Sequence, residues 1–146
     1  MKINPEKIME GMIKKGFPDL YKESITLKYY MKRKNCFMDY SLYSDKSYSI
    51  GISEIMKNCS VAVFKGGLGH ELSHIARERT ETKTQDRLYK KYKEYRLLEE
   101  RDTDLETIIR GYGKELLKFV EFTDKIKAYT KEAGLSAREV RNLLKK

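Results

Sequence analysis

The residues best suited to chemistry lie in the segment GHELSH (69–74), which holds the only two histidines of the chain. On a helix, His70 and His74 lie on one face about one turn apart, so both imidazoles can reach a single metal ion. Glu71 is rotated off that face and can contact a metal-bound water without binding the metal. This HExxH spacing is typical of zinc hydrolases, in which it supplies two zinc ligands and a general base.

The residues around the motif favour a buried helix over about 61–79. The alternative is a surface helix on which both histidines are solvated. Apolar residues flank the motif on both sides, which supports burial and a metal site; they are Val61–Phe64, Leu68, Leu72 and Ile75.

Three glycines, Gly66, Gly67 and Gly69, fall inside this expected helix. Each costs about 1 kcal/mol relative to alanine in a helix interior. Two explanations stay open at this point. Either another backbone approaches the helix closely, or the helix begins only near Leu68.

A catalytic zinc site usually has three protein ligands, and with both histidines used the third is expected to be acidic. Glu78 shares the helix face of His70 but lies about 12 Å away along the axis, because the rise is about 1.5 Å per residue. It cannot converge on the same ion and is expected at the surface. The third ligand must come from another element, and the best segment is Leu97–Asp104 on a long helix expected over about 86–110.

Within that segment, Glu100 has Asp104 four residues later on the same face. One carboxylate can bind zinc while the other orients a histidine, as zinc-bound histidines generally require. Helical phase does not separate Glu99 from Glu100 as the ligand. The alternative is that both glutamates belong to a solvated charged face.

Composition predicts one globular domain. The 146 residues are 40% hydrophobic and 36% charged, and no apolar run approaches the roughly 20 residues of a membrane span. The charged N-terminus lacks the apolar stretch of a signal peptide, so we expect a soluble cytoplasmic protein. Cys36 and Cys59 are too few for a disulfide framework and form no CxxC pair, so they are not expected to ligate metal.

The net charge of +9 raises nucleic acid as a partner. The densest basic runs, 32–34 and 90–93, lie beside acidic residues, and the other basic residues are spread along the chain. A solvated Lys/Glu surface is therefore the favoured interpretation, and a nucleic-acid partner is not expected.

The expected fold is α+β: a small, mostly antiparallel sheet packs on the HExxH helix and the Glu-bearing helix, with additional helices at the C-terminus. Asn4 and Pro5 begin a first helix that ends at Gly16. Other elements are expected as strands 25–31, 36–43 and 47–54, a polar connection 80–85, a helix 114–133, and a short helix that begins with the capping box Ser136–Glu139.

HExxH on one helix and Glu-x-x-x-Asp on the next resemble the gluzincin zinc metallopeptidases. The small size, the lack of membrane spans and the GHELSH segment resemble their soluble members, the minigluzincins. The resemblance implies one zinc ion bound by His70, His74 and Glu100. It also implies that Asp104 supports these ligands without binding zinc and that Glu71 is the base. It implies a zinc endopeptidase acting on a peptide or protein substrate.

Two further parts of such a site are less well defined. Many gluzincins stabilise the developing oxyanion with an additional His or Tyr, and Tyr112 or Arg110 could serve here although no motif places either. The segment Ser47–Glu54 could be an edge strand over the cleft that binds an extended substrate, or an ordinary edge strand.

The expected catalytic domain covers residues 1–113, which leaves 114–146 as a C-terminal helical segment. Its apolar stripe could lie over its own cleft or cross to a second molecule, with Gly134 as a hinge and a homodimer as the result; the stripe is Leu135, Val140, Leu143 and Leu144. The helices could also simply complete the core. The family resemblance implies a zymogen-like, latent protein.

A competing hypothesis from another class is a basic, zinc-containing binding module for nucleic acid or a regulatory protein, without general proteolysis. Glu71 separates the two hypotheses, because a purely structural metal site needs no base beside it. A third possibility is an HExxH protein with one physiological target.

Overall fold

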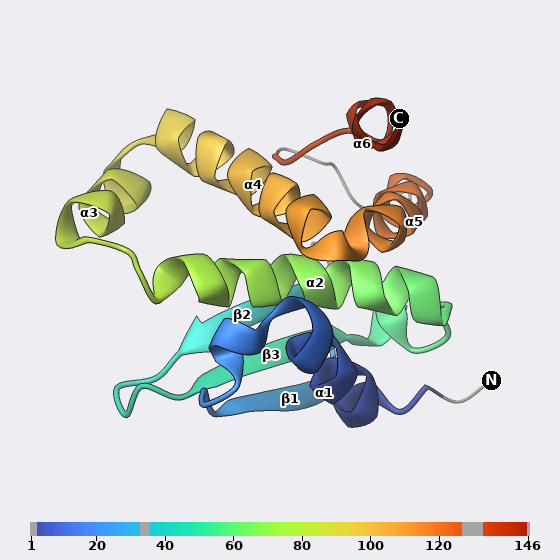
Figure 1. The fold of residues 1–146 in the computed structure, drawn as a ribbon, viewed down its shortest axis with the longest axis horizontal. Coiled ribbons are helices and arrows are strands. Elements are labelled where there is room, and N and C mark those ends of the chain that lie inside the picture. Colours follow the sequence, from blue (N-terminus) through green and yellow to red (C-terminus); the bar gives the residue numbers. More distant parts are fainter. Residues whose placement is uncertain (1–2, 33–35, 127–132, 146) are drawn as a thin grey trace.

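Helix α2 (Val61–Glu78) runs through the middle of the molecule, with the sheet on one side and helices α4 and α5 on the other (Figure 1). The computed structural model describes residues 3–32, 36–126 and 133–145. It confirms the α+β fold, with elements α1 (Pro5–Gly16), β1 (Ile25–Met31), β2 (Met38–Leu42), β3 (Tyr48–Ser53), α2, α3 (Lys83–Lys91), α4 (Lys93–Thr107), α5 (Gly113–Asp124) and α6 (Ala137–Leu144).

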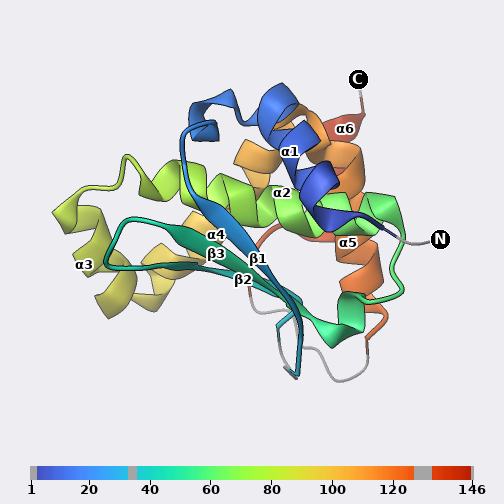
Figure 2. The ribbon, with the colours of Figure 1, turned by 90° about the horizontal axis from the view of Figure 1, so that it is seen from below.

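The sheet has the strand order β1-β3-β2 and lies across one side of α2 (Figure 2). Strand β3 pairs antiparallel with β2, to which a short turn joins it, and parallel with β1 on its other edge. The sheet is thus mixed rather than mostly antiparallel. Because β3 is paired along both edges, the expectation that Ser47–Glu54 forms an edge strand is wrong, and every residue of β3 is buried. Over the described residues, β2 is the edge strand on that side.

The predicted helix caps are present in the first and last helices of the chain. Asn4 accepts a hydrogen bond from the backbone N–H of Lys7, at 3.2 Å, and begins α1. Ser136 and Glu139 form the reciprocal capping box of α6. Both caps satisfy N–H groups that have no partner within the first turn of a helix.

The glycines of α2 allow the close approach of another backbone. The helix begins at Val61, with Ser60 as its cap, and continues unbroken through all three glycines. A Cβ on Gly66 would overlap the backbone oxygen of Glu115 in α5. The first of the two explanations is therefore confirmed, and α5 packs directly on the helix that carries the histidines.

Gly66→Ala should lower the free energy of unfolding by about 1–3 kcal/mol, because α5 must move to admit the methyl group. Gly11, in α1, has open space around its Cβ position. Gly11→Ala should therefore raise the same free energy by about 0.5–1 kcal/mol. Urea denaturation of both variants measures the difference, and an unchanged stability of Gly66→Ala would contradict the close packing of α2 and α5.

The helix expected over 86–110 is divided into two. The backbone is extended at Tyr92, which separates α3 from α4. Helix α3 begins earlier than expected because Thr82 and Gln85 form a capping box. Beyond α4 a π turn spans Ile108–Tyr112, in which Gly111 has a φ of 98°, a conformation that favours glycine.

The C-terminal helices pack onto the rest of the chain. Helix α5 lies against α2, and α6 lies against α5. A second small core joins them, formed by Leu116, Val120, Leu135 and Val140. A boundary after residue 113 would cut through the α2–α5 contact, so α5 belongs structurally with the elements before it. The expected helix 114–133 ends at Asp124, and its last residues, 127–132, lie outside the described residues.

None of the helices in the part of the chain that the structure describes is both long enough and apolar enough to cross a membrane.

Candidate metal centre

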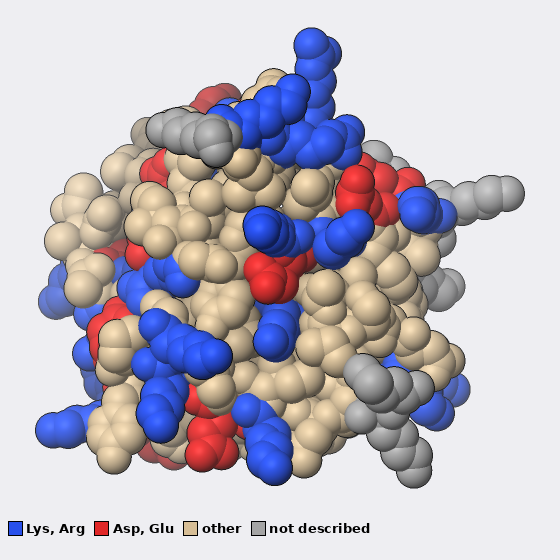
Figure 3. Space-filling model, turned by 45° about the vertical axis from the view of Figure 1, so that its right-hand side comes forward, with Lys and Arg blue, Asp and Glu red and all other residues tan. Residues whose placement is uncertain are grey.

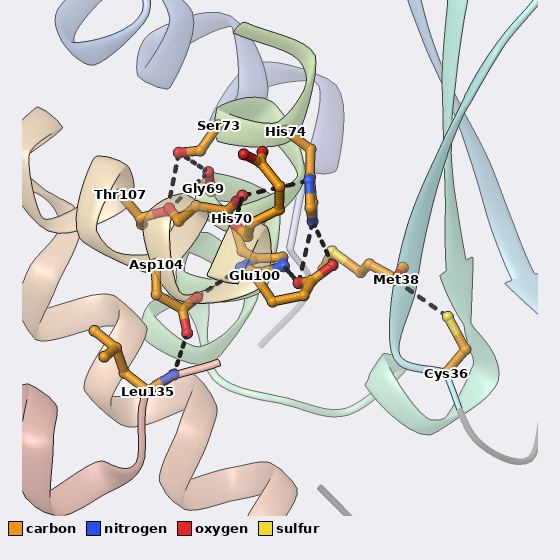
Figure 4. Close-up of polar contacts among 12 residues, drawn as sticks. Cys36, Met38, Gly69, His70, Ser73, His74, Glu100, Asp104, Thr107 and Leu135 are labelled. Carbon is orange, nitrogen blue, oxygen red and sulfur yellow. Dashed lines mark hydrogen bonds and ion pairs between the residues drawn. The ribbon is translucent and has the colours of Figure 1, made fainter. Parts of the chain in front are cut away.

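The two histidines project from α2 toward α4, where Glu100 lies between them (Figure 4). Their imidazole rings are nearly perpendicular, with centroids 4.6 Å apart. One oxygen of Glu100, Oε2, lies 3.1 Å from Nε2 of His70 and 3.3 Å from Nε2 of His74. Three side chains from two helices therefore converge on one point, as the sequence pattern predicted.

These separations match those between ligands of one metal ion. Ligand atoms bound tetrahedrally at about 2.0–2.1 Å lie about 3.3 Å from one another. The ligand atoms of His70, Glu71 and His74 all lie within 4.8 Å of one another, and this group could hold a metal ion. Two imidazole nitrogens and one carboxylate also form a donor set common in catalytic metal sites.

Asp104 fixes the orientation of His70 through the ring nitrogen that does not face Glu100. Its Oδ1 lies 2.7 Å from Nδ1 of His70, which is the short distance of a charge-assisted hydrogen bond. With its proton on Nδ1, a neutral imidazole turns the Nε2 lone pair toward Glu100. A lone pair facing a carboxylate is repulsive unless a cation lies between them. The arrangement thus favours a metal ion or an added proton at this point.

The structure separates Glu100 from Glu99, which helical phase had left open. The carboxylate of Glu99 accepts hydrogen bonds from Nη2 of Arg77 at 3.1 and 3.2 Å. This pair lies away from the histidines, so only Glu100 reaches both imidazoles. Glu78 does not line the pocket that contains them.

Glu71 is buried beside the histidines, with 5% of its surface exposed. Burial raises the pKa of Glu71 to about 7, although the two histidines oppose this shift. A carboxylate with a pKa near neutrality can both accept and return a proton at physiological pH. Burial also disfavours charge on His70, but the carboxylates of Asp104 and Glu100 outweigh it and raise the pKa of His70 well above its usual value.

These shifts predict that the metal-free protein loses stability as pH rises from 5 to 8. Glu71 and His70 both bind protons more tightly in the folded state, so their favourable contribution is present at low pH and is lost as they deprotonate. The shift of Glu71 alone corresponds to on the order of 3 kcal/mol. Urea unfolding between pH 5 and pH 8, with a chelator present, measures the free energy of unfolding at each pH. A metal ion should reverse the trend, because it binds the deprotonated form of His70 and its positive charge favours the deprotonated form of Glu71.

The pocket that contains these residues is lined by the sheet and by helices α2, α3, α4 and α5. Strand β2 contributes three residues and α3 contributes one; the lining is Cys36, Phe37, Met38, Asp39, Tyr40, Gly67, His70, Glu71, His74, Tyr89, Glu100 and Phe119. The ring of Tyr40 stacks on His74, with centroids 5.1 Å apart. Sequence reasoning missed both tyrosines, since neither lies near the motif in sequence or in a recognisable pattern with it.

Tyr112 and Arg110, the residues suggested as oxyanion stabilisers, do not line this pocket. Tyr112 is buried and stacks on Phe17, with ring centroids 6.0 Å apart. Arg110 forms ion pairs with Asp19 and Glu106. The π turn after α4 directs both residues toward α1 and the turn that follows it, so the structure does not bring them to the metal centre.

Comparison of the chain with protein-family models, with curated proteins and with solved structures found no match.

Proposed function

We propose that this protein is a zinc-dependent metallopeptidase of the minigluzincin type. The observation that carries the proposal is the convergence of His70, His74 and Glu100 on one point with the buried carboxyl of Glu71 beside it. Two imidazoles and a carboxylate suit zinc, and a base has no use at a purely structural zinc site. This combination favours a hydrolase over the zinc-containing binding module.

A zinc ion bound there would act as a Lewis acid, polarising a peptide carbonyl and lowering the pKa of water toward about 7. Glu71 would take a proton from the attacking water and transfer it to the leaving amine. Asp104 would keep His70 in one tautomer throughout the cycle.

The substrate would bind along β2. This strand pairs with β3 on one edge, and Met38, Asp39 and Tyr40 bring it to the pocket. An extended peptide could pair with the other edge and present a carbonyl to a zinc ion held by His70, His74 and Glu100, with Glu71 beside it. The role first assigned to Ser47–Glu54 is therefore proposed for β2.

Tyr89 is the proposed oxyanion donor in place of Tyr112 and Arg110. It lines the pocket with Glu71 and Glu100 and is 36% exposed; its partial burial, with the nearby charge of Glu100, raises its pKa so that its hydroxyl keeps its proton. Tyr89→Phe should lower kcat by roughly tenfold or more with little change in KM, because the donor acts only on the developing charge. Tyr92→Phe, outside the pocket, is the matched control. Equal activity of the two variants would argue against this role.

Latency was expected from the C-terminal segment. None of residues 133–145 lines the pocket, while 127–132 lie outside the described residues. Obstruction of the cleft by the C-terminal segment of a second copy of the chain is one form of this hypothesis, and it does not require residues 133–145 to line their own pocket. A dependence of activity on protein concentration would test it.

The surface charge gives little support to the nucleic-acid hypothesis. On the face drawn in Figure 3, Lys and Arg side chains are dispersed, with acidic side chains between several of them. Ion pairs account for part of the basic surface, including Arg101 with Glu139 and Arg141 with Glu121.

The direct test is cleavage of a quenched fluorescent peptide mixture by the full-length protein in three states: loaded with zinc, treated with chelator, and reloaded. Cleavage that disappears on chelation and returns with zinc is the expected result. A folded, zinc-loaded protein that cleaves no peptide at any concentration would contradict the proposal and favour a binding module.

A further inference from the structure

Asp104 joins the metal centre to the C-terminal segment. Its Oδ1 faces Nδ1 of His70 at 2.7 Å, and its Oδ2 accepts a hydrogen bond from the backbone N–H of Leu135 at 2.8 Å (Figure 4). Asp104 is only 3% exposed and Leu135 only 2%. A buried carboxylate needs hydrogen-bond partners on both oxygens, and here one of the two comes from a residue 31 positions away.

The segment that carries Leu135 has two further anchors, both after this contact in the chain. Glu139 pairs with Arg101 of α4, at 2.8 Å. Val140 is fully buried in the small core that α5 and α6 share. These contacts hold α6 against the helix that supplies Glu100 and Asp104, and they do so outside the pocket.

We propose that residues 133–145 are a positioning element of the metal centre, acting through the Leu135–Asp104–His70 chain of hydrogen bonds. This inference rests on the metal site of the proposed function. The N–H of Leu135 holds the Asp104 carboxylate in the rotamer that orients His70, so the docked segment prepares the site for metal. The role is opposite to the inhibitory one expected from the sequence, because loss of the segment weakens the site.

The coupling works in both directions. If the docked segment strengthens metal binding, bound metal strengthens docking by the same factor. Partners that orient a metal-ligating histidine change metal affinity by about 10–100-fold. The coupling can therefore be measured as a change in zinc affinity and as a change in amide exchange within the C-terminal segment, without any measurement of peptide cleavage.

The first test is zinc affinity, measured by chelator competition on full-length variants. Leu135→Pro removes the N–H, whereas Leu135→Ala keeps it and removes only the packing of the side chain. We expect zinc to bind Leu135→Pro at least about tenfold more weakly than Leu135→Ala. Equal affinity of the two folded variants would overturn the inference while leaving the proposed function intact.

The second test needs no variant, which guards against misfolding of Leu135→Pro. Amide hydrogen exchange of the wild-type protein is followed by NMR with and without saturating zinc. Val120 lies in the same small core and has no bond to Asp104, so its amide reports general stabilisation. We expect zinc to slow exchange at Leu135 more than at Val120. Equal slowing at the two amides would overturn the inference, and failure of the wild-type protein to bind zinc would overturn both proposals.

Discussion

Glu71→Gln should abolish peptide hydrolysis, reducing kcat on the order of a thousandfold, while zinc remains bound with nearly unchanged affinity. The amide is close in size to the carboxylate, so the buried position beside His70 and His74 is preserved. It has no basic oxygen, so it cannot take a proton from water or deliver one to the leaving amine. The measurement is kcat on a fluorescent peptide, with zinc content determined on the same samples.

The control for this variant is Glu81→Gln, which removes an exposed carboxylate outside the pocket. Its kcat should stay within about twofold of the wild type. If Glu71→Gln kept a tenth or more of the wild-type kcat, Glu71 would not be the base and the assignment of the mechanism would be wrong.

Glu100→Gln should weaken zinc binding by at least about 100-fold, because among the described residues it replaces the one carboxylate that lies within ion-pair distance of both imidazoles. Its neighbour provides a closely matched comparison. Glu99 lies on the same helix as Glu100, but its carboxylate pairs with Arg77 of α2. Glu99→Gln therefore leaves the site untouched, and zinc affinity should be unchanged. Chelator competition measures the zinc affinity of each variant.

The opposite ranking would identify Glu99 as the ligand. Equal affinities in both variants would mean that neither carboxylate binds the metal and that the convergence seen around Glu100 has another cause.

The parts of the site that follow from local periodicity could be predicted from the sequence. The i, i+4 spacing places His70 and His74 on one helix face, and the same spacing pairs Glu100 with Asp104. The spacing to Asp104 favoured Glu100 over Glu99, but helical phase did not separate the two. The position of Glu99 depends on Arg77, with which it pairs across an interface between two helices, and local periodicity contains no such information.

The remaining differences also arise from contacts between distant segments. Strand β3 resembles an edge strand in its alternating pattern, yet it pairs on both sides because β1 joins it in parallel. Tyr89 reaches the pocket because the extended backbone at Tyr92 interrupts the helix, so α3 and α4 run in different directions. Leu135 looked like part of an apolar stripe. Its functional group here is its backbone N–H, which every residue but proline possesses.

One zinc ion should bind between His70, His74 and Glu100, and zinc-edge X-ray absorption of the full-length protein with one equivalent of zinc would identify its ligands. We expect only nitrogen and oxygen ligands at about 2.0–2.1 Å, with the scattering pattern of two imidazoles. A sulfur ligand at about 2.3 Å, or fewer than two imidazoles, would contradict it.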